Sequence, residues 1–305
     1  MAAPPATLHR HAPAQAIVLW CFAALLFTSQ GAILKWLSDH YHFSEILFFR
    51  SVVVVAVLTI FLVRGPGLGA PFRTRQAKLH VARFLCFFVA LTCFIEAVKQ
   101  ISLSDAIAVT FAAPLMMTAL AVPLLGERIG PRRWTAVIVG LGGVLVIGNP
   151  STGIFEVAAL WALGSALGYA LAIIVTRKLT GTDPTVVIVW TLNALYLVTM
   201  PFFIPFTWVV PTWPHLALMA VGGLVVLVAQ LVAVHACRLA PPQVLAPFDY
   251  TAMIWAILLD LIIWHVLPSL TVIGGAAILI ACGIYILYRE AKVSRSKAHD
   301  TTGGS

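Results

Sequence analysis

VVPTWPHLALMAVGGLVVLVAQLVAV, residues Val209–Val234, is an apolar stretch that contains no Asp, Glu, Lys or Arg. It is longer than the roughly 20 residues with which an α-helix crosses a bilayer. Similar apolar runs, such as Ser51–Val63, recur along the chain, so a single membrane anchor is excluded. Backbone groups in lipid need internal hydrogen-bond partners, and the alternating pattern of a β-barrel is absent. The stretch therefore predicts an all-α polytopic membrane protein.

The composition of the whole chain agrees with this interpretation. Hydrophobic residues make up 61% of the 305 residues and charged residues 10%, whereas a soluble domain carries about 25% charge. The net charge of +8 is explained by basic residues in cytoplasmic loops rather than by nucleic-acid binding. The five cysteines lie in apolar segments without metal-like CxxC spacing, so we read them as small core residues. We expect no metal and no cofactor.

The apolar segments fall into two sets of five. We predict spans at 15–36, 43–63, 79–99, 104–125, 132–148, 155–176, 184–207, 213–236, 243–264 and 268–288. A unit of five spans begins on one side of the membrane and ends on the other, so its duplicate must be upside down. The predicted fold is therefore ten transmembrane helices in a 5+5 inverted-topology repeat, an arrangement common in secondary transporters.

The basic residues give the orientation. With ten spans, only Lys35, Arg50 and Lys99 of the 19 Lys and Arg residues fall on the side opposite the termini. Basic residues concentrate in cytoplasmic loops, so both termini are expected in the cytoplasm and the protein in the cell (inner) membrane. We expect a cytoplasmic tail at 1–14, a first repeat at 15–148, a second repeat at 155–288, and a cytoplasmic tail at 289–305 that ends in a tag remnant.

Weak internal similarity supports the duplication. Leu19-Trp20 opens the first span as Leu160-Trp161 opens the sixth, and Ala97–Ile147 aligns with Ala236–Ile286 at an offset of about 140. The sequence Gly164-Ser-Ala-Leu-Gly168 is a GxxxG motif, whose small residues let helices approach closely in lipid. Chance similarity between apolar helices is the alternative, and the shared order of signals favours duplication.

Several motifs together resemble a known family. They are Lys35, Glu45 through Phe49-Arg50, His80-x-x-Arg83, Pro114, Gly126-Glu127-Arg128, Arg132-Arg133-Trp134, Asn149-Pro150 and Ala246-Pro247-Phe248-x-Tyr250. In this order they look like the drug/metabolite transporter (DMT) superfamily, EamA type, over residues 15–288. The stretch from His80 to Pro150 looks closest to its riboflavin and S-adenosylmethionine branch. The second repeat departs from the pattern, because His265-Val-Leu-Pro268 stands where Gly126-Glu127-Arg128 would be.

The resemblance implies a central cavity, alternating access and ten helices. Its members handle amino acids, aromatic metabolites, riboflavin, S-adenosylmethionine and metallophores. We carry no single substrate over to this chain, because members of one branch differ in substrate and direction.

Asp249 is the sharpest candidate for a functional residue. It lies about seven residues inside the ninth span, roughly 10 Å from the cytoplasmic end of that helix. Ionisable groups at membrane depth are functional hypotheses by default, so Asp249 is expected to hold a cationic group or a proton. The alternative is a carboxylate hydrogen-bonded to Tyr or Thr between helices. Thr110 aligns with Asp249 at an offset of 139 and is expected to face it across the cavity.

The other membrane charges read mainly as structural pairs. Arg50 could attract a substrate carboxylate, although pairing with Glu45, Glu96 or Asp105 is favoured because these acids lie near the same depth. Glu96 and Lys99 have the i, i+3 spacing of a helix ion pair. Arg83 and Glu127 are expected to pair near the cytoplasmic face. Lys35 is expected to snorkel outward, and Asp260 to lie at the interface.

Two prolines and a set of polar or aromatic residues complete the candidate site. Pro114 and Pro247 interrupt the hydrogen-bond ladder of their helices and are candidate hinges or gates, although lipid-embedded helices also tolerate proline for structural reasons. The expected cavity residues are Gln30, Trp161, Tyr169, Asn193, Gln230 and Tyr250, with Trp20, Ser29 and Ser165 beside them. Trp20 and Trp161 read equally well as lipid-facing belt residues.

The sequence thus favours a secondary transporter of a small organic metabolite, such as an amino acid or an aromatic or nucleoside-like compound. No GxxxxGK[ST] motif is present, so ATP is not expected to drive it directly. The rival interpretations are a polytopic membrane enzyme, for which HExxH and nucleophile-elbow motifs are missing, and a channel. Proton coupling, direction and oligomeric state stay open.

Overall fold

The computed structural model describes residues 13–125, 153–203, 208–240 and 245–268, with a few further helical residues between 134 and 142 and between 270 and 285. All regular elements in this part of the chain are helical. The α-helices are α1 (Pro13–Ser38), α2 (Phe43–Arg64), α3 (Ala77–Val98), α4 (Leu103–Thr110), α5 (Ala112–Leu125), α7 (Gly153–Thr180), α8 (Thr185–Thr199), α9 (Trp213–Leu239) and α11 (Thr251–Leu259). Short helical turns occur at η1 (Ala70–Phe72), η2 (Met200–Phe202), η4 (Ala246–Tyr250) and η5 (Asp260–Trp264).

Six of the described helices are long and apolar enough to cross a membrane. These spans are Ala14–Ser38, Phe43–Arg64, Ala77–Val98, Val157–Thr180, Thr185–Phe202 and Trp213–Leu239. Large apolar side chains such as Val18, Phe61 and Ile60 are exposed on their outer surfaces, as expected where lipid replaces water. The all-α polytopic fold is therefore confirmed. The predicted spans 132–148 and 268–288 lie mostly outside the described residues.

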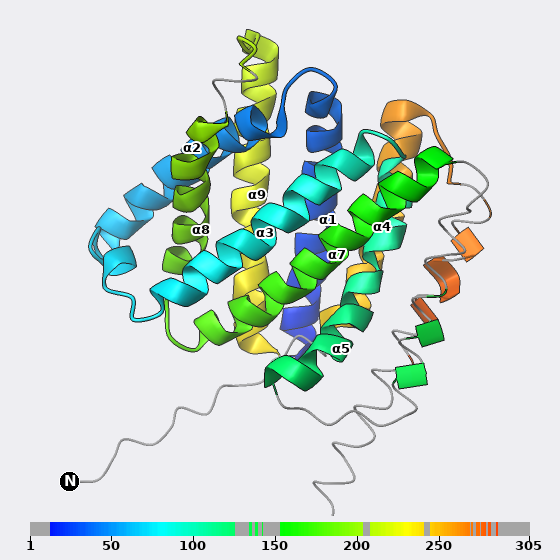
Figure 1. Cartoon of the computed structure of the whole chain (residues 1–305). Helices are drawn as coiled ribbons and strands as arrows, with labels where there is room; N and C mark the ends of the chain where they lie inside the picture. Colours follow the sequence, from blue (N-terminus) through cyan, green and yellow to red (C-terminus); the bar gives the residue numbers. More distant parts are fainter. Residues whose placement is uncertain are drawn as a thin grey trace, which may run out of the picture.

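The long helices pack in antiparallel pairs (Figure 1). The most extensive contacts join α3 with α7, α1 with α9, and α2 with α8. In each pair the two helices run in opposite directions, so that one end of the bundle carries the end of α2, the start of α3 and the ends of α7 and α9. We call this the basic end, because Arg64, Arg177 and Arg238 lie in the last turns of these helices. We call the opposite end the far end.

The predicted span 104–125 is not one continuous helix. It is divided into α4 and α5, with Phe111 as the turn between them. Pro114 has no N–H to donate to the carbonyl of Thr110, four residues earlier, so the ladder cannot run unbroken through this point. The predicted span 243–264 is divided as well. Its described residues form the 3₁₀ turn η4, then α11, and then the π-helical turn η5.

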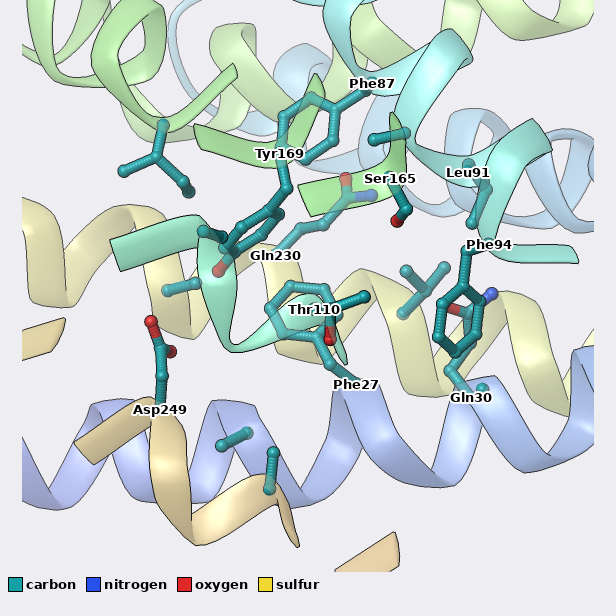
Figure 2. A pocket seen from close by; sticks show the side chains of 18 of the residues that line it. Phe27, Gln30, Phe87, Leu91, Phe94, Thr110, Ser165, Tyr169, Gln230 and Asp249 are labelled. Carbon is teal, nitrogen blue, oxygen red and sulfur yellow. The ribbon is translucent and has the colours of Figure 1, made fainter. Parts of the chain in front are cut away.

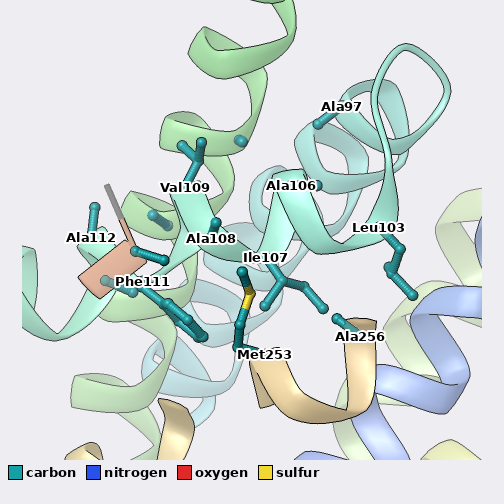
Figure 3. Packing of buried hydrophobic residues seen from close by; sticks show 14 of the residues in the cluster. Ala97, Leu103, Ala106, Ile107, Ala108, Val109, Phe111, Ala112, Met253 and Ala256 are labelled. Atoms are coloured by element: carbon teal, nitrogen blue, oxygen red, sulfur yellow. The ribbon is translucent and has the colours of Figure 1, made fainter. Parts of the chain in front are cut away.

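The divided segments meet in a hydrophobic cluster in which α4 faces α11 (Figure 3). Ile107 and Met253 pack there with alanines that allow the backbones to approach. The ring of Phe111 meets the ring of Tyr250 edge-on, with centroids 5.0 Å apart. This cluster ties the two broken segments together beside α7.

Glycines set the distance between the long helices. A Cβ placed on Gly168 in α7 would lie 2.8 Å from the backbone nitrogen of Ala90 and 2.8 Å from the carbonyl of Cys86 in α3. A Cβ on Gly223 in α9 would lie 2.9 Å from the carbonyl of Arg50 in α2. The GxxxG motif therefore lets α7 approach α3 closely, as the sequence predicts.

Asp260 caps α4 at the far end of the bundle. Its carboxylate is fully buried and accepts hydrogen bonds from the backbone nitrogens of Leu103 at 3.2 Å and Ser104 at 2.6 Å. Free N–H groups at a helix N-terminus favour a negative charge. The Nζ of Lys35 lies 3.9 Å from this carboxylate and donates to the carbonyl of Ile101 at 3.1 Å. The expectations of an interfacial Asp260 and an outward-pointing Lys35 were therefore wrong, because α4 offers both groups partners inside the fold.

We expect Gly168→Ala to destabilise the protein by about 1–3 kcal/mol, because the added Cβ overpacks against backbone atoms that have little room to move. Thermal unfolding of purified protein in detergent measures this. Gly142→Ala is the matched control, since a Cβ there would meet nothing within 4 Å. Equal melting temperatures for the two variants would contradict the close approach of α3 and α7.

We expect Asp260→Asn to cost about 1.5–3 kcal/mol, because the amide removes a charge-assisted acceptor and brings an N–H₂ group towards backbone donors. The same unfolding assay applies. Asp39→Asn, in the exposed turn directly after α1, is the control and should leave the melting temperature unchanged. A similar loss in both variants would argue against the cap.

Candidate functional site

A cavity of about 250 Å³ lies between the helices of the bundle. Its wall is mostly apolar, with Phe27, Phe87 and Phe94 among its aromatic rings (Figure 2). A small number of polar side chains from α1, α2, α3, α4, α7, α8, α9 and η4 reach it. Concave, mainly apolar sites with a few placed polar groups are typical of small-molecule binding, at volumes of roughly 300–1,000 Å³.

Asp249 lies at one side of this cavity, and some of the residues that the sequence predicts beside it line the cavity too. Its Oδ1 accepts a hydrogen bond from the indole Nε1 of Trp20, in α1, at 2.7 Å. The hydroxyl of Tyr169 points towards the same side, and Thr110 also lines the cavity (Figure 2). Within the described residues, no Lys, Arg or His nitrogen lies within 4.0 Å of Asp249.

The local structure at Asp249 differs from the regular helix that the sequence predicts. Asp249 belongs to the 3₁₀ turn η4, and α11 begins only at Thr251. Pro247 in this turn cannot donate a backbone hydrogen bond. The Oγ1 of Thr251 donates to the carbonyl of Phe248 at 2.7 Å, across the junction between the turn and the helix. The tight turn ends directly before α11 and holds Asp249 at the cavity.

Two amide side chains act together in the wall. The Nδ2 of Asn193, in α8, donates to Gln230 Oε1 and to the carbonyl of Val189, both at 2.9 Å. Gln230, in α9, lines the cavity, whereas Asn193 is fully buried behind it. Asn193 is therefore a positioning residue. Gln30, in α1, also lines the cavity, and its buried Nε2 has no hydrogen-bond partner in the described part of the chain.

The two arginines of the cavity wall differ sharply in their contacts. Arg83, in α3, donates its Nε to Thr176 Oγ1 and its Nη1 to the carbonyl of Ile188, both at 2.8 Å. Arg83 thus ties α3 to α7 and α8. Its predicted partner Glu127 lies outside the described residues, so that pair stays a prediction.

Arg50 has none of the partners expected for it. It is 3% exposed, and its guanidinium lies 5.6 Å from the centre of the Tyr196 ring. Glu45 accepts from the backbone nitrogen of Val209 at 3.2 Å instead. Among the described residues no carboxylate lies within 4.0 Å of Arg50. The expectation of an ion pair with Glu45, Glu96 or Asp105 was therefore wrong, because nearness in depth does not place the acids on the face that Arg50 uses.

The remaining predicted residues are distributed between the wall, the core and the surface. Pro114 lines the cavity, and Tyr250 packs against Phe111 in the core rather than lining it. Trp161 is 40% exposed on the outside of α7, so it does not line the cavity. Trp20, which the predicted repeat aligns with Trp161, is only 4% exposed. The Nζ of Lys99 lies 2.7 Å from Glu96 Oε1, on a partly exposed face.

A polar cluster joins three elements at the basic end, and the sequence reasoning did not predict it. Asp183 Oδ2 accepts from Thr74 Oγ1 at 2.8 Å and lies 3.0 Å from His80 Nε2. Arg238 donates to the carbonyl of Asp183, and its Nε donates to Thr185 Oγ1 at 2.8 Å. The loop before α3, the α7–α8 turn and the end of α9 are thereby linked. These contacts join residues that are far apart in the sequence, so local spacing does not predict them.

Comparisons with known proteins find a family match in the first half of the chain and relatives along most of it. Residues 14–149 match the EamA-like transporter family. Relatives along most of the chain include an S-adenosylmethionine uptake transporter of Rickettsia prowazekii, 26% identical over 92% of this chain and 95% of the relative. A riboflavin transporter of Rhizobium johnstonii is 26% identical over 94% of this chain and 96% of the relative. A pseudopaline exporter of Pseudomonas aeruginosa is 27% identical over 87% of this chain and 94% of the relative.

One crystal structure matches with a TM-score of 0.59 at 19% identity, over 93% of this chain and 98% of the other, and this likeness shows the fold alone. The resemblance predicted from the sequence is confirmed by the family match and by the full-length relatives, which are transporters and not enzymes. Residues 14–149 thus form an EamA-like transporter family domain, and the chain is similar over most of its length to transporters of the drug/metabolite transporter superfamily.

Proposed function

We propose that this protein is a secondary transporter that moves a small organic metabolite through the cavity by alternating access. The cavity lies between two inverted repeats, residues 15–148 and 155–288, which together make ten transmembrane helices. Both termini lie in the cytoplasm, and the bacterial relatives favour the inner membrane. The observation that carries the proposal is the cavity itself, which holds a carboxylate, Asp249, with an indole N–H as its partner among the described residues.

The helix contacts support the inverted repeat. At the offset of 139 residues, exchanging the two halves of the predicted topology converts α1, α2 and α3 into α7, α8 and α9, α4 into η4, and α5 into α11. Under this exchange the contact of α1 with α9 becomes that of α7 with α3, and both exist. The contact of α5 with α7 becomes that of α11 with α1, and the contact of α4 with α7 becomes that of η4 with α1; all four exist. The contact of α2 with α8 converts into itself.

The two breaks in the chain support the same symmetry. Phe111 and Tyr250 are 139 residues apart, the offset at which Thr110 aligns with Asp249. Each of them stands at the junction between two helical segments. Residues exchanged by a two-fold axis can touch one another only near that axis, and these two rings do touch. The breaks therefore lie close to the centre of the repeat, beside the cavity.

The cargo is a small metabolite that meets both aromatic rings and a carboxylate. Aromatic walls suit planar or cationic molecules. Asp249 can hold a cationic group of the substrate or a proton that travels with it, because its carboxylate has one hydrogen bond from Trp20 and remaining acceptor capacity. The relatives carry chemically different cargoes, so transport has to be measured for a range of compounds.

Flux in proteoliposomes tests the proposal. Purified protein is reconstituted and assayed for uptake and counterflow of S-adenosylmethionine, riboflavin and amino acids, with and without a pH gradient. Saturable counterflow of one compound is expected. Conductive, non-saturating flux would contradict the carrier mechanism and favour a channel.

We expect Asp249→Asn to reduce transport of that compound by about 10- to 100-fold, the effect of losing a charge-assisted hydrogen bond of roughly 1.5–3 kcal/mol. Any dependence of transport on the pH gradient should fall with it if Asp249 carries the proton. Glu96→Gln, which removes a partly exposed carboxylate outside the cavity, is the matched control. Unchanged transport and pH dependence in Asp249→Asn would show that the site is assigned wrongly.

We expect Pro114→Ala to slow transport by about tenfold, equivalent to 1.4 kcal/mol, because restoring the backbone donor lets α4 and α5 join into a stiffer helix. The substrate concentration that gives half of the maximal rate should change less than the maximal rate itself. Pro214→Ala is the control. Pro214 lies in the first turn of α9, where a backbone N–H has no acceptor within the helix, so its absence there costs no helix hydrogen bond. Equal rates in both variants would argue against a hinge at Pro114.

A further inference from the structure

We propose that Arg50 is a subsite for a carboxylate of the transported substrate, so that the substrate is an amphoteric molecule held between Arg50 and Asp249. This inference rests on the proposed function, because it names the chemical class of the cargo. Arg50 is 3% exposed and lines the cavity.

Arg50 is a buried cation that has no counter-ion among the residues that the structure describes. Its Nε has no hydrogen-bond partner, and no carboxylate of the described residues lies within 4.0 Å. An unpaired buried charge is costly, and an ionisable group kept at membrane depth marks a substrate or ion pathway more often than a structural position. Lipid-facing snorkelling does not explain Arg50, because its side chain is enclosed.

Arg83 provides the comparison within the same cavity. Its guanidinium is also buried, yet its donors reach Thr176 Oγ1 and the carbonyl of Ile188. The fold therefore can satisfy a buried arginine with neutral acceptors, and it does so for Arg83. It leaves Arg50 with the face of the Tyr196 ring at 5.6 Å. A ring face stabilises the cation and fixes its plane without occupying any N–H group.

The packing of α2 against α9 fixes the backbone that carries the Arg50 guanidinium. Gly223 of α9 lies so close to the carbonyl of Arg50 that an added Cβ would be 2.9 Å from it. The backbone that carries Arg50 is thus held against α9. A planar fork of N–H donors on a fixed backbone matches a carboxylate, which can accept two parallel hydrogen bonds.

Two other polar groups of the cavity wall fit the same ligand. Gln30 is 5% exposed, lines the cavity and has a buried Nε2 with no hydrogen-bond partner among the described residues. It offers one more donor. Asp249 lines the same cavity from η4 and is not paired with Arg50. A molecule with a carboxylate and a cationic group can satisfy both charges at once, whereas a neutral aromatic molecule leaves both unpaired.

The test uses pairs of compounds that differ only in the carboxylate. S-Adenosylmethionine is compared with decarboxylated S-adenosylmethionine, tryptophan with tryptamine, and phenylalanine with phenethylamine, with riboflavin as a compound that lacks the group. Binding is measured by thermal protection of the purified protein, and transport by competition in proteoliposomes. At least one carboxylate-bearing compound is expected to bind about tenfold or more tightly than its decarboxylated partner, as for a charge-assisted bidentate contact.

Variants then assign the preference to Arg50. In Arg50→Met the preference for the carboxylate should disappear, so that both members of a pair bind about equally. Arg50→Lys, which keeps the charge without the planar fork of donors, should retain part of the preference. Arg64→Gln, at the exposed end of the same helix, should retain the full preference. Thermal unfolding without ligand checks that each variant is folded, and the wild-type comparison of paired compounds does not depend on any variant.

The outcomes separate this inference from the proposed function. Equal binding of both members of every pair, or an unchanged preference in a folded Arg50→Met protein, overturns the carboxylate subsite. Saturable transport of riboflavin alone also overturns it while leaving the transporter mechanism intact. Absence of saturable transport for every compound, carboxylates and riboflavin included, counts against both.

Discussion

The close approach of antiparallel helices through small residues is the constraint on which the structure depends. Lipid supplies no hydrophobic force between helices, so their association rests on tight packing and on interhelical hydrogen bonds. Gly168 brings α7 onto the backbone of α3, and Gly223 brings α9 onto the carbonyl of Arg50. The residue after Gly168 is Tyr169, which lines the cavity. The same contacts that close the bundle therefore fix the residues of the site.

The electrostatics of the cavity follow from which charges the fold satisfies. Arg83 donates to a hydroxyl and a carbonyl, and Asp260 is engaged by backbone donors and Lys35. Among the described residues Asp249 has one donor, and Arg50 has an aromatic face. Arg83 and Asp260 join helices to one another, and Arg83 does so from the cavity wall. Asp249 and Arg50 line the same cavity with fewer partners, and this difference in partners, rather than depth in the membrane, is the basis for the proposed site.

The sequence predicted the long spans because an apolar segment of about 20 residues is typical of a helix that crosses a membrane. It predicted breaks near Pro114 and Pro247, because proline removes a ladder bond, but not how the segments divide around Phe111 and Tyr250. Repeat alignment treated Trp20 and Trp161 as equivalent, yet one binds Asp249 and the other is exposed. The partners of Arg50 and Asp260 depend on which helix faces meet, and a single sequence does not contain that information.

The proposed alternating access requires contacts between the two proposed repeats that open in turn, and two polar clusters join elements of both. At the far end, Asp260 and Lys35 join η5 and α1 to the start of α4. At the basic end, Asp183, His80 and Arg238 join the α7–α8 turn to α3 and α9. Each cluster has only a few hydrogen bonds, worth about 0.5–3 kcal/mol each. Opening either one thus costs a few kcal/mol, the gap across which a bound substrate can shift a two-state equilibrium.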